Sequence, residues 1–437
     1  MPASPRSPQT RCSRTPIEMG RTLSRRNSER GQTILLVAVS LVALLGLVAL
    51  AIDVVTLYVA RSEAQRAADA AALAGAKMLV DAGVTSDPCN STLATNAQTL
   101  AQTQGALVGA QNNVAGQAPT VVISFPNGAQ TTNCPNAFGI NPQAKAVVTR
   151  TGLPTFFARI WSQGLGTVSA TATAEAYNPS NSSSLNASAA VNPIAPRCIK
   201  PMLLPNCDPN KGCGTPLVDP TTGAIQRPGT AGVVGEQFTM AANCNPGVIP
   251  CTTNPPTAGQ YYPIVLDQTA LHLCPACSTS TAGFQWDLEC CNGAALACGQ
   301  QVTLNTSENP NGGGGLAVGG GRCLINFPGN DLFDPTTNPI SFIAESNNPF
   351  VGSTIQTGDH ILNSQSVVTV PIYDSRTSAP TNPVTIIGFL QLFINTVGGN
   401  GQMTTYVLNV SGCGNAPSGV PIQGSGTSVP VRLIQAP

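Results

Sequence analysis

A long run of apolar residues near the start of the chain dominates its hydrophobic pattern. Ile34 to Ile52 covers nineteen residues with no charge and no proline, and Ser40 is the one clearly polar member. A helix rises about 1.5 Å per residue, so a helix of this length spans roughly the 30 Å hydrocarbon core of a bilayer. The pattern therefore predicts a transmembrane helix, whose anchoring side chains include Ile34, Leu41, Leu45, Leu50 and Ile52.

A cleaved secretory signal is the alternative for this run. The apolar region of a signal peptide covers about 7–15 residues and ends at a small-residue cleavage site. This run is longer, and it is followed by Asp53 and Tyr58 without a turn. We therefore expect an uncleaved anchor.

The helical pattern continues beyond the apolar run. Residues 54–80 contain no proline, and Ala67 to Val80 consists mainly of strong helix formers. Small residues recur every four positions along this extension, so that another helix or a sheet can approach closely; the two rows are Ala64, Ala68, Ala72 and Ala76, and Ala67, Ala71 and Gly75. We expect the extension to pack on the chain's own soluble part, with the helix of a partner as the alternative.

Asp53 lies at the end of the apolar run, where a carboxylate is expected to reach water. Contact with a neighbouring subunit is the alternative. The residues that we assign to helix packing or partner contact are Asp53, Arg61, Ala68, Asp69, Ala72 and Gly75.

Residues 83–178 have the pattern of a small α+β domain. The apolar spacing of residues 91–105 predicts a helix, and Pro154 begins a short amphipathic helix at residues 155–161. Runs rich in β-branched residues or with alternating polarity predict three strands, at residues 120–125, 144–149 and 167–177. A helix layer packed on a sheet is the economical arrangement of these elements.

A polar linker at residues 179–196 precedes a region of different character. Residues 197–437 contain Pro/Gly-rich loops and most of the cysteines, and three strands are predicted near their end, at residues 367–373, 384–395 and 403–410. The second strand is apolar on both faces and is expected to be central, whereas Pro371 predicts an edge position for the first. The whole chain is thus expected to be α+β, with a disordered basic cytoplasmic segment at 1–30 that has almost no apolar residues, a helix at 31–82, and two domains.

Charge is distributed unevenly although Lys+Arg and Asp+Glu balance at 20 each. Seven arginines precede the apolar run and only Glu18 and Glu29 oppose them; the arginines are Arg6, Arg11, Arg14, Arg21, Arg25, Arg26 and Arg30. By the positive-inside rule this flank lies in the cytoplasm and the remainder lies outside it. The remainder is mildly acidic, so nucleic acid is not expected as a partner.

The chain has 15 cysteines, and their location agrees with this orientation. Cys12 lies on the predicted cytoplasmic side, and the other 14 are disulfide candidates in an oxidising compartment: Cys89, Cys134, Cys198, Cys207, Cys213, Cys244, Cys251, Cys274, Cys277, Cys290, Cys291, Cys298, Cys323 and Cys413. Cys89 and Cys134 are the only two in the α+β domain, so we pair them. Cys413 is expected to tie the last strand back to the cysteine-rich region.

Candidate chemistry is sparse, because the chain has two histidines, His272 and His360. His272 precedes Cys274 and Cys277, which are spaced as a zinc or redox pair would be. We favour disulfides for these cysteines and expect no bound metal or cofactor. We also expect no enzymatic activity, since the sequence has no hydrolase or phosphate-loop motif.

Several segments of the N-terminal helix resemble a known family. Arg30-Gly31-Gln32, Leu50-Ala51-Ile52-Asp53, Leu57-Tyr58-Val59-Ala60-Arg61 and residues 68–76 are similar to the N-terminal module of TadE/TadG-like proteins of Flp (tight adherence) pilus assembly. The resemblance implies a single-pass inner-membrane protein whose C-terminal part is periplasmic or extracellular. It also implies partners among other Tad pilus assembly components or pilin-like subunits.

The chain departs from related patterns at two positions. Arg30-Gly31 looks like a prepilin cleavage junction, but Leu36 stands where such a junction has Glu, so processing is not expected. Some relatives carry a metal site of the type Asp-x-Ser-x-Ser, but after Asp374 the position of the first serine is taken by Arg376, so this metal site is not expected.

The function predicted is anchoring in the lipid bilayer and protein–protein contact in pilus assembly or adherence. A membrane-tethered adhesin unrelated to pili is the alternative.

Overall fold

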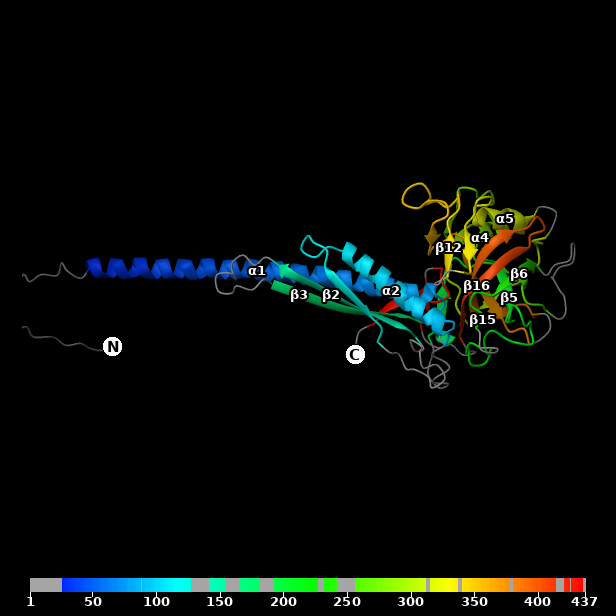
Figure 1. Cartoon of the computed structure of the whole chain (residues 1–437), viewed down its shortest axis with the longest axis horizontal. Helices are drawn as coiled ribbons and strands as arrows, with labels where there is room; N and C mark the ends of the chain where they lie inside the picture. Colours follow the sequence, from blue (N-terminus) through cyan, green and yellow to red (C-terminus); the bar gives the residue numbers. More distant parts are fainter. Residues whose placement is uncertain are drawn as a thin grey trace, which may run out of the picture. The chain divides into compact units, whose positions relative to one another are not determined.

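A single helix, α1 (Arg26–Asp81), is the longest element of the computed structural model (Figure 1). The structure describes residues 26–87, 89–126, 141–153, 166–180, 192–226, 232–242, 256–311, 315–336, 340–376, 380–413, 420–424 and 426–434. The chain divides into two units, of which the first comprises Met1–Tyr58 and Leu153–Gly166, and the second Val59–Gly152 and Thr167–Pro437. The long apolar run of α1 belongs to the first unit, and its small-residue extension belongs to the second.

Next to the extension of α1 lies a helix layer on a four-stranded sheet. The helix α2 (Ser91–Gln111) begins at Asn90, whose side chain accepts hydrogen bonds from the N–H groups of Thr92 and Leu93. The strands are β1 (Thr120–Ser124), β2 (Gln143–Leu153), β3 (Gly166–Ala176) and β18 (Val431–Ile434), in the order β1-β2-β3-β18. This confirms the predicted helix and the three predicted strands, whereas the short helix expected at 155–161 lies outside the described residues.

The strand β18 has no counterpart in the sequence predictions. It pairs antiparallel with β3, with Val431 opposite Ala176. Arg432 donates from Nε to Oε1 of Glu175 at 2.6 Å across this pair. The last strand of the chain thus completes a sheet whose other strands come from residues 120–176.

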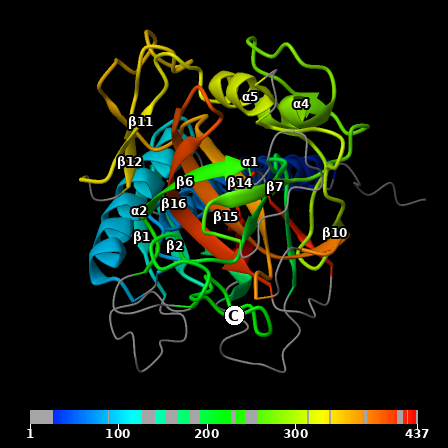
Figure 2. The same ribbon diagram turned by 90° about the vertical axis from the view of Figure 1, so that its right-hand side faces the viewer.

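Six strands of the C-terminal region pair in a closed ring, which makes a small barrel (Figure 2). They are β5 (Met202–Pro205), β6 (Gln237–Ala242), β7 (Gln260–Pro263), β14 (Val367–Tyr373), β15 (Val384–Val397) and β16 (Met403–Gly412). The order around the ring is β15-β14-β5-β7-β6-β16 and back to β15, while β10 (Gln301–Val302) pairs with β15. Nearly every residue of β15 is buried, as expected for a strand that is apolar on both faces.

The expectation that Pro371 marks an edge strand is wrong, because β14 lies between β15 and β5. The carbonyl of Thr369 accepts from the N–H of Lys200, which leads into β5. Residues two apart in a strand direct their backbone groups to the same side. The missing N–H of Pro371 therefore faces the short β5, which pairs only with Ile372 and Tyr373, and the longer ladder with β15 is unaffected.

Smaller elements surround the barrel. The strands β11 (Leu332–Asp334), β12 (Ser341–Ile343) and β13 (His360–Ile361) form a three-stranded sheet, with Phe333 and Phe342 packed on Phe393 of β15. Two further pairs are β4 (Ile194–Pro196) with β17 (Ile422–Gly424) and β8 (His272–Leu273) with β9 (Cys291–Asn292). The helices α4 (Gly283–Glu289) and α5 (Leu316–Leu324) lie side by side (Figure 2).

Candidate functional site

The apolar run of α1 is exposed along its length. The predicted anchoring side chains are all at the surface, from 71% exposed at Ile34, through Leu41, Leu45 and Leu50, to 47% at Ile52. Among the described residues, α1 is the helix that is long and apolar enough to cross a membrane, and almost none of this run is buried. A core helix of a soluble domain would hide such a surface, so exposure of this extent favours a lipid environment.

Asp53 does not reach water as expected, because only 3% of its surface is exposed, and the residue has an interaction partner. A buried carboxylate needs a donor or cation that compensates for its lost hydration. Arg61 is exposed, and Asp69 is half-buried and accepts from Nε2 of Gln65 at 2.8 Å.

The small-residue rows of α1 contact the helix and sheet of their own chain. Ala68 and Ala72 are fully buried, and Gly75 lies so close to Ala144 of β2 that a Cβ there would be 3.1 Å from the alanine Cβ. On α2, a Cβ at Gly109 would be 2.9 Å from the Cβ of Ala71. Because Gly75 and Gly109 have no side chains, α1 can lie close to β2 and α2 can lie close to α1.

A buried hydrogen-bond network, which we call the Asn409 network, fixes the end of α1 to the barrel strand β16. The amide of Asn409 donates to the carbonyl of Val80 at 3.1 Å and to Oε1 of Gln391 at 2.8 Å. Its Oδ1 accepts from the hydroxyls of Thr85 and Ser86 at 3.2 and 3.1 Å. All four hydrogen-bonding positions of this amide are thus used, which defines its orientation.

Five disulfides join described cysteines of the C-terminal region: Cys198–Cys291, Cys207–Cys213, Cys274–Cys290, Cys277–Cys323 and Cys298–Cys413. The interpretation of these cysteines as disulfides is confirmed for these pairs. The bond from Cys298 to Cys413 confirms that the end of β16 is tied to the cysteine-rich region. Cys89 is disulfide-bonded, while its predicted partner Cys134, together with Cys12, Cys244 and Cys251, lies outside the described residues.

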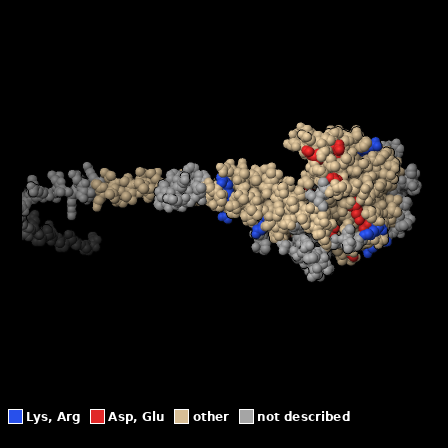
Figure 3. Space-filling view, in the orientation of Figure 1, with Lys and Arg blue, Asp and Glu red and all other residues tan. Residues whose placement is uncertain are grey.

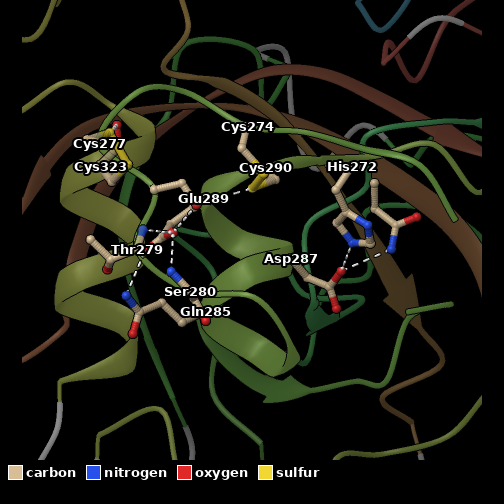
Figure 4. Close-up of a disulfide and its surroundings, with 12 residues drawn as sticks. His272, Cys274, Cys277, Thr279, Ser280, Gln285, Asp287, Glu289, Cys290 and Cys323 are labelled. Atoms are coloured by element: carbon tan, nitrogen blue, oxygen red, sulfur yellow. Dashed lines mark hydrogen bonds and ion pairs between the residues drawn. A yellow bond between two sulfur atoms is a disulfide. The ribbon is translucent and has the colours of Figure 1, made fainter. Parts of the chain in front are cut away.

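His272 lies beside these disulfides in a closed setting (Figure 4). Its side chain is 1% exposed; Nε2 lies 2.9 Å from Oδ1 of Asp287, and Nδ1 lies 2.8 Å from the carbonyl of Ala270. The ring stacks on Trp286 with 3.6 Å between the centroids. With both nitrogens engaged and no open face, this imidazole orients α4 against β8.

His360 meets Ser341 and Asp334 on the three-stranded sheet, in a combination that invites comparison with a hydrolase triad. The serine Oγ lies 3.1 Å from Nδ1 of His360, and Oδ2 of the aspartate lies 3.8 Å from the same nitrogen. A triad requires the serine on one ring nitrogen and the carboxylate on the other. The geometry is therefore not that of a nucleophile–base relay.

Lys200, which no sequence pattern singled out, is buried near the same disulfides. Its Nζ donates to the carbonyl of Cys290 at 2.7 Å, and 4% of the residue is exposed. Burial lowers the pKa of this amine to about 7, against a smaller opposing effect of Asp287. Its only sequence signal was one basic residue in a region that is nearly free of charge.

The surface bears few charges, as the low charged content of the sequence requires. The face in Figure 3 shows scattered Lys and Arg, and scattered Asp and Glu, among mainly uncharged residues. No basic stripe of the kind that binds nucleic acid is visible on the described part of this face.

No curated protein and no solved structure matches this chain. Comparison with protein-family models gives a match that lies on α1. The matched residues contain the apolar run, Asp53 and the small-residue rows, which are the segments that carry the resemblance noted in the sequence. Residues 31–78 thus match the model of the putative Flp pilus-assembly TadE/G-like family, which confirms that resemblance for the N-terminal module.

Proposed function

We propose that this chain is a single-pass inner-membrane protein of Flp pilus assembly. In this role α1 anchors the chain in the lipid bilayer, and the C-terminal part contacts other assembly components or pilin-like subunits. One observation carries the proposal, namely that the family match at residues 31–78 coincides with the exposed apolar run of α1.

In this arrangement the N-terminus lies in the cytoplasm and the C-terminal part is periplasmic or extracellular. The arginines that precede the apolar run support this orientation. The five disulfides give independent support, because such bonds persist in oxidising compartments and are rare in the cytosol.

The mechanism that we propose is anchoring and contact without catalysis. The Asn409 network and the glycine contacts of α1 join the helix extension to the α2 layer and to the barrel. A partner that binds these parts would thereby be held close to the membrane. The closed surroundings of His272 and the geometry at His360 support a role that needs no reactive side chain.

The test is co-purification of a tagged full-length chain with other pilus assembly components after extraction in mild detergent. Leu41→Arg places a charge in the apolar run, at a cost of about 2.5–3.5 kcal/mol at the centre of a membrane helix. We expect this variant to be depleted in the membrane fraction and to co-purify with smaller amounts of these components.

The matched control is Leu107→Arg, which makes the same change at an exposed leucine of α2. It should leave both membrane association and co-purification unaffected. Stable membrane association without any pilus component in the wild-type extract would refute the pilus role and favour a free-standing adhesin. Recovery of the wild-type chain in the soluble fraction, without detergent, would refute the anchor.

A further inference from the structure

A cavity of about 280 Å³ lies where the end of α1 meets the barrel strands and β12. Its lining includes Lys77 and Asp81 of α1, Phe342 of β12, Gln391 of β15 and Asn409 of β16. We call it the Gln391 cavity. Small-molecule sites have volumes of roughly 300–1,000 Å³, so a ligand of this cavity is a small molecule or one unit of a larger one.

The side-chain amide of Gln391 is bonded at its oxygen and free at its nitrogen. Oε1 accepts from Nδ2 of Asn409 at 2.8 Å, so the Asn409 network determines which end of this amide is the oxygen. Among the residues that the structure describes, Nε2 meets no acceptor, although only 5% of Gln391 is exposed. This nitrogen is not sealed in the interior, and the open space that Gln391 lines is the cavity. Two N–H donors therefore face the cavity without a partner.

Two further lining residues have unused hydrogen-bonding groups. Oδ1 of Asp81 pairs with Nζ of Lys77, while its Oδ2 is buried and accepts no hydrogen bond in the described structure. Asn363 is exposed, and its amide makes no hydrogen bond to another described residue. The lining thus offers both donors and acceptors. A hydroxyl group matches such a surface because it donates and accepts at once.

The lining carries no net charge. Of its described residues, Lys77 and Asp81 are the ionisable ones, and they pair with each other. A third carboxylate, Asp331, lies behind Ser364 and is occupied by the hydroxyl of Ser364 at 2.6 Å and by the amide of Asn348 at 3.0 Å. An anionic ligand would meet Asp81 and a cationic ligand would meet Lys77, so neither has an advantage over a neutral one.

Much of the remaining wall is apolar. Ile340, Leu362 and Leu408 line the cavity together with Phe342, which stacks on Phe393 with 4.6 Å between the ring centroids. A pyranose ring has hydroxyl groups around its rim and C–H groups on its faces, so it matches a site that combines polar groups with an apolar wall. An extended peptide would instead bind through backbone hydrogen bonds along a strand edge, whereas the free groups of this cavity belong to side chains.

We propose that the Gln391 cavity binds one neutral hexopyranose ring. Nε2 of Gln391 donates to a ring hydroxyl, the amide of Asn363 bonds to a second hydroxyl, and a C–H face of the sugar packs on Leu362. Each hydroxyl exchanges a hydrogen bond to water for one to the protein, so binding depends on the geometry of several weak contacts. This role is separate from anchoring and does not depend on the pilus proposal.

Saturation-transfer difference NMR on the full-length chain, in a detergent without a sugar headgroup, tests the proposal. The probes are the methyl glycosides of glucose, galactose and mannose. We expect saturable transfer to at least one of them, and binding of that glycoside at least fivefold weaker in Gln391→Met, which has no N–H donor. Gln98→Met, at an exposed position of α2, should leave the affinity unchanged. The absence of saturable transfer to all three glycosides at 50 mM would overturn the proposal.

Asn363→Ala decides the question if Gln391→Met does not fold, because it removes an amide at an exposed position of the lining. It should weaken binding of the glycoside at least threefold. Asn113→Ala makes the same change at an exposed asparagine outside the cavity and should have no effect. An affinity of Asn363→Ala equal to that of Asn113→Ala would overturn the site.

Competition against the bound glycoside distinguishes a neutral sugar from other ligands. Glucuronate and glucosamine, which carry opposite charges, should bind no more tightly than the neutral glycoside, and the neutral peptide N-acetyl-triserine amide should not displace it. Tenfold tighter binding of either charged sugar, or displacement by the peptide, would overturn the proposal. A trisaccharide of the same hexose identifies the source of the ring, because tighter binding than the methyl glycoside indicates a unit of a glycan and weaker binding indicates a free sugar.

Discussion

Lys200 gives the folded chain an unusual dependence on pH. Its pKa falls from 10.5 to about 7 on folding because of burial, so the unfolded chain binds more protons than the folded chain between these values. Stability then rises with pH from about 7 upward. Each unit of pKa corresponds to about 1.4 kcal/mol, so the free energy of unfolding should increase by up to roughly 2–3 kcal/mol between pH 7 and pH 9.

Urea unfolding of the oxidised chain, followed by tryptophan fluorescence at pH 6 to 9, measures this rise in the free energy of unfolding. The increase of the unfolding free energy with pH should vanish in Lys200→Met and persist in Lys211→Met, at an exposed lysine. A rise with pH that Lys200→Met leaves intact would refute the assignment of this effect to Lys200. Above about pH 10 burial of Tyr261 and Tyr373, which raises the pKa of both phenols, should reverse the trend.

Asn409 shows how a buried polar residue defines one arrangement of neighbouring segments. Asn409→Ala would leave the Thr85 and Ser86 hydroxyls, the Gln391 amide and the Val80 carbonyl without this partner. Each buried hydrogen bond that is lost contributes about 0.5–1.5 kcal/mol to stability, and four are lost together, so we expect a loss of roughly 2–4 kcal/mol in urea unfolding. Gln98→Ala, at an exposed position of α2, should change stability by less than about 0.5 kcal/mol. Equal effects of the two substitutions would show that the network adds no stability.

At the scale of elements, the contact of α1 with α2 depends on missing side chains. Gly109→Leu would place a Cβ 2.9 Å from both Ala71 and Val121, and neither neighbour has a flexible end that can move away. We expect the Tm to fall by about 5 °C or more, because overpacking costs about 1–3 kcal/mol or more. Thr103→Leu adds the same side chain to an exposed position of the same helix and should leave the Tm nearly unchanged. A Tm for Gly109→Leu as high as that for Thr103→Leu would mean that the helices separate without cost.

The sequence predicted those elements whose own pattern determines them. The apolar run of α1, the strand patterns of β3 and β15 and the spacing on α2 each encode their structure locally. The barrel was not predicted because β5 and β7 have only four residues each, too few for a periodic signal. The strands with which they pair are far away in the chain. The edge position expected from Pro371 was wrong, because the cost of its missing N–H depends on which neighbouring strand that position faces.

The candidate site was predictable only in part for the same reason. The number and compartment of the cysteines indicated disulfides, but sequence alone does not specify which cysteines pair. The burial of Asp53 and that of Lys200 depend on tertiary contacts. A lysine between Ile199 and Pro201 has no local feature that distinguishes it from a surface lysine.

At the scale of the whole molecule, the proposed orientation predicts where each thiol is accessible. Intact cells are labelled with a membrane-impermeant, mass-tagged thiol reagent before and after reduction, and the peptides are mapped. We expect Cys12 to be shielded in both conditions, because the proposed orientation places it in the cytoplasm. Cysteines of the five disulfides should be labelled only after reduction. Labelling of Cys12 in intact cells would reverse the orientation, and labelling of Cys274 or Cys290 without reduction would refute their disulfide.

The pairing of β18 with β3 has a consequence for the biosynthesis of the chain. Residue 176 leaves the ribosome long before residue 431, and at about 5–20 residues per second the interval is on the order of 10–50 s. During that time the nascent chain presents the edge of β3 without its final strand, and an open edge can pair with strands of other molecules. The newborn protein therefore has a window in which a chaperone, or a strand from an assembly partner, can occupy the place that β18 later takes.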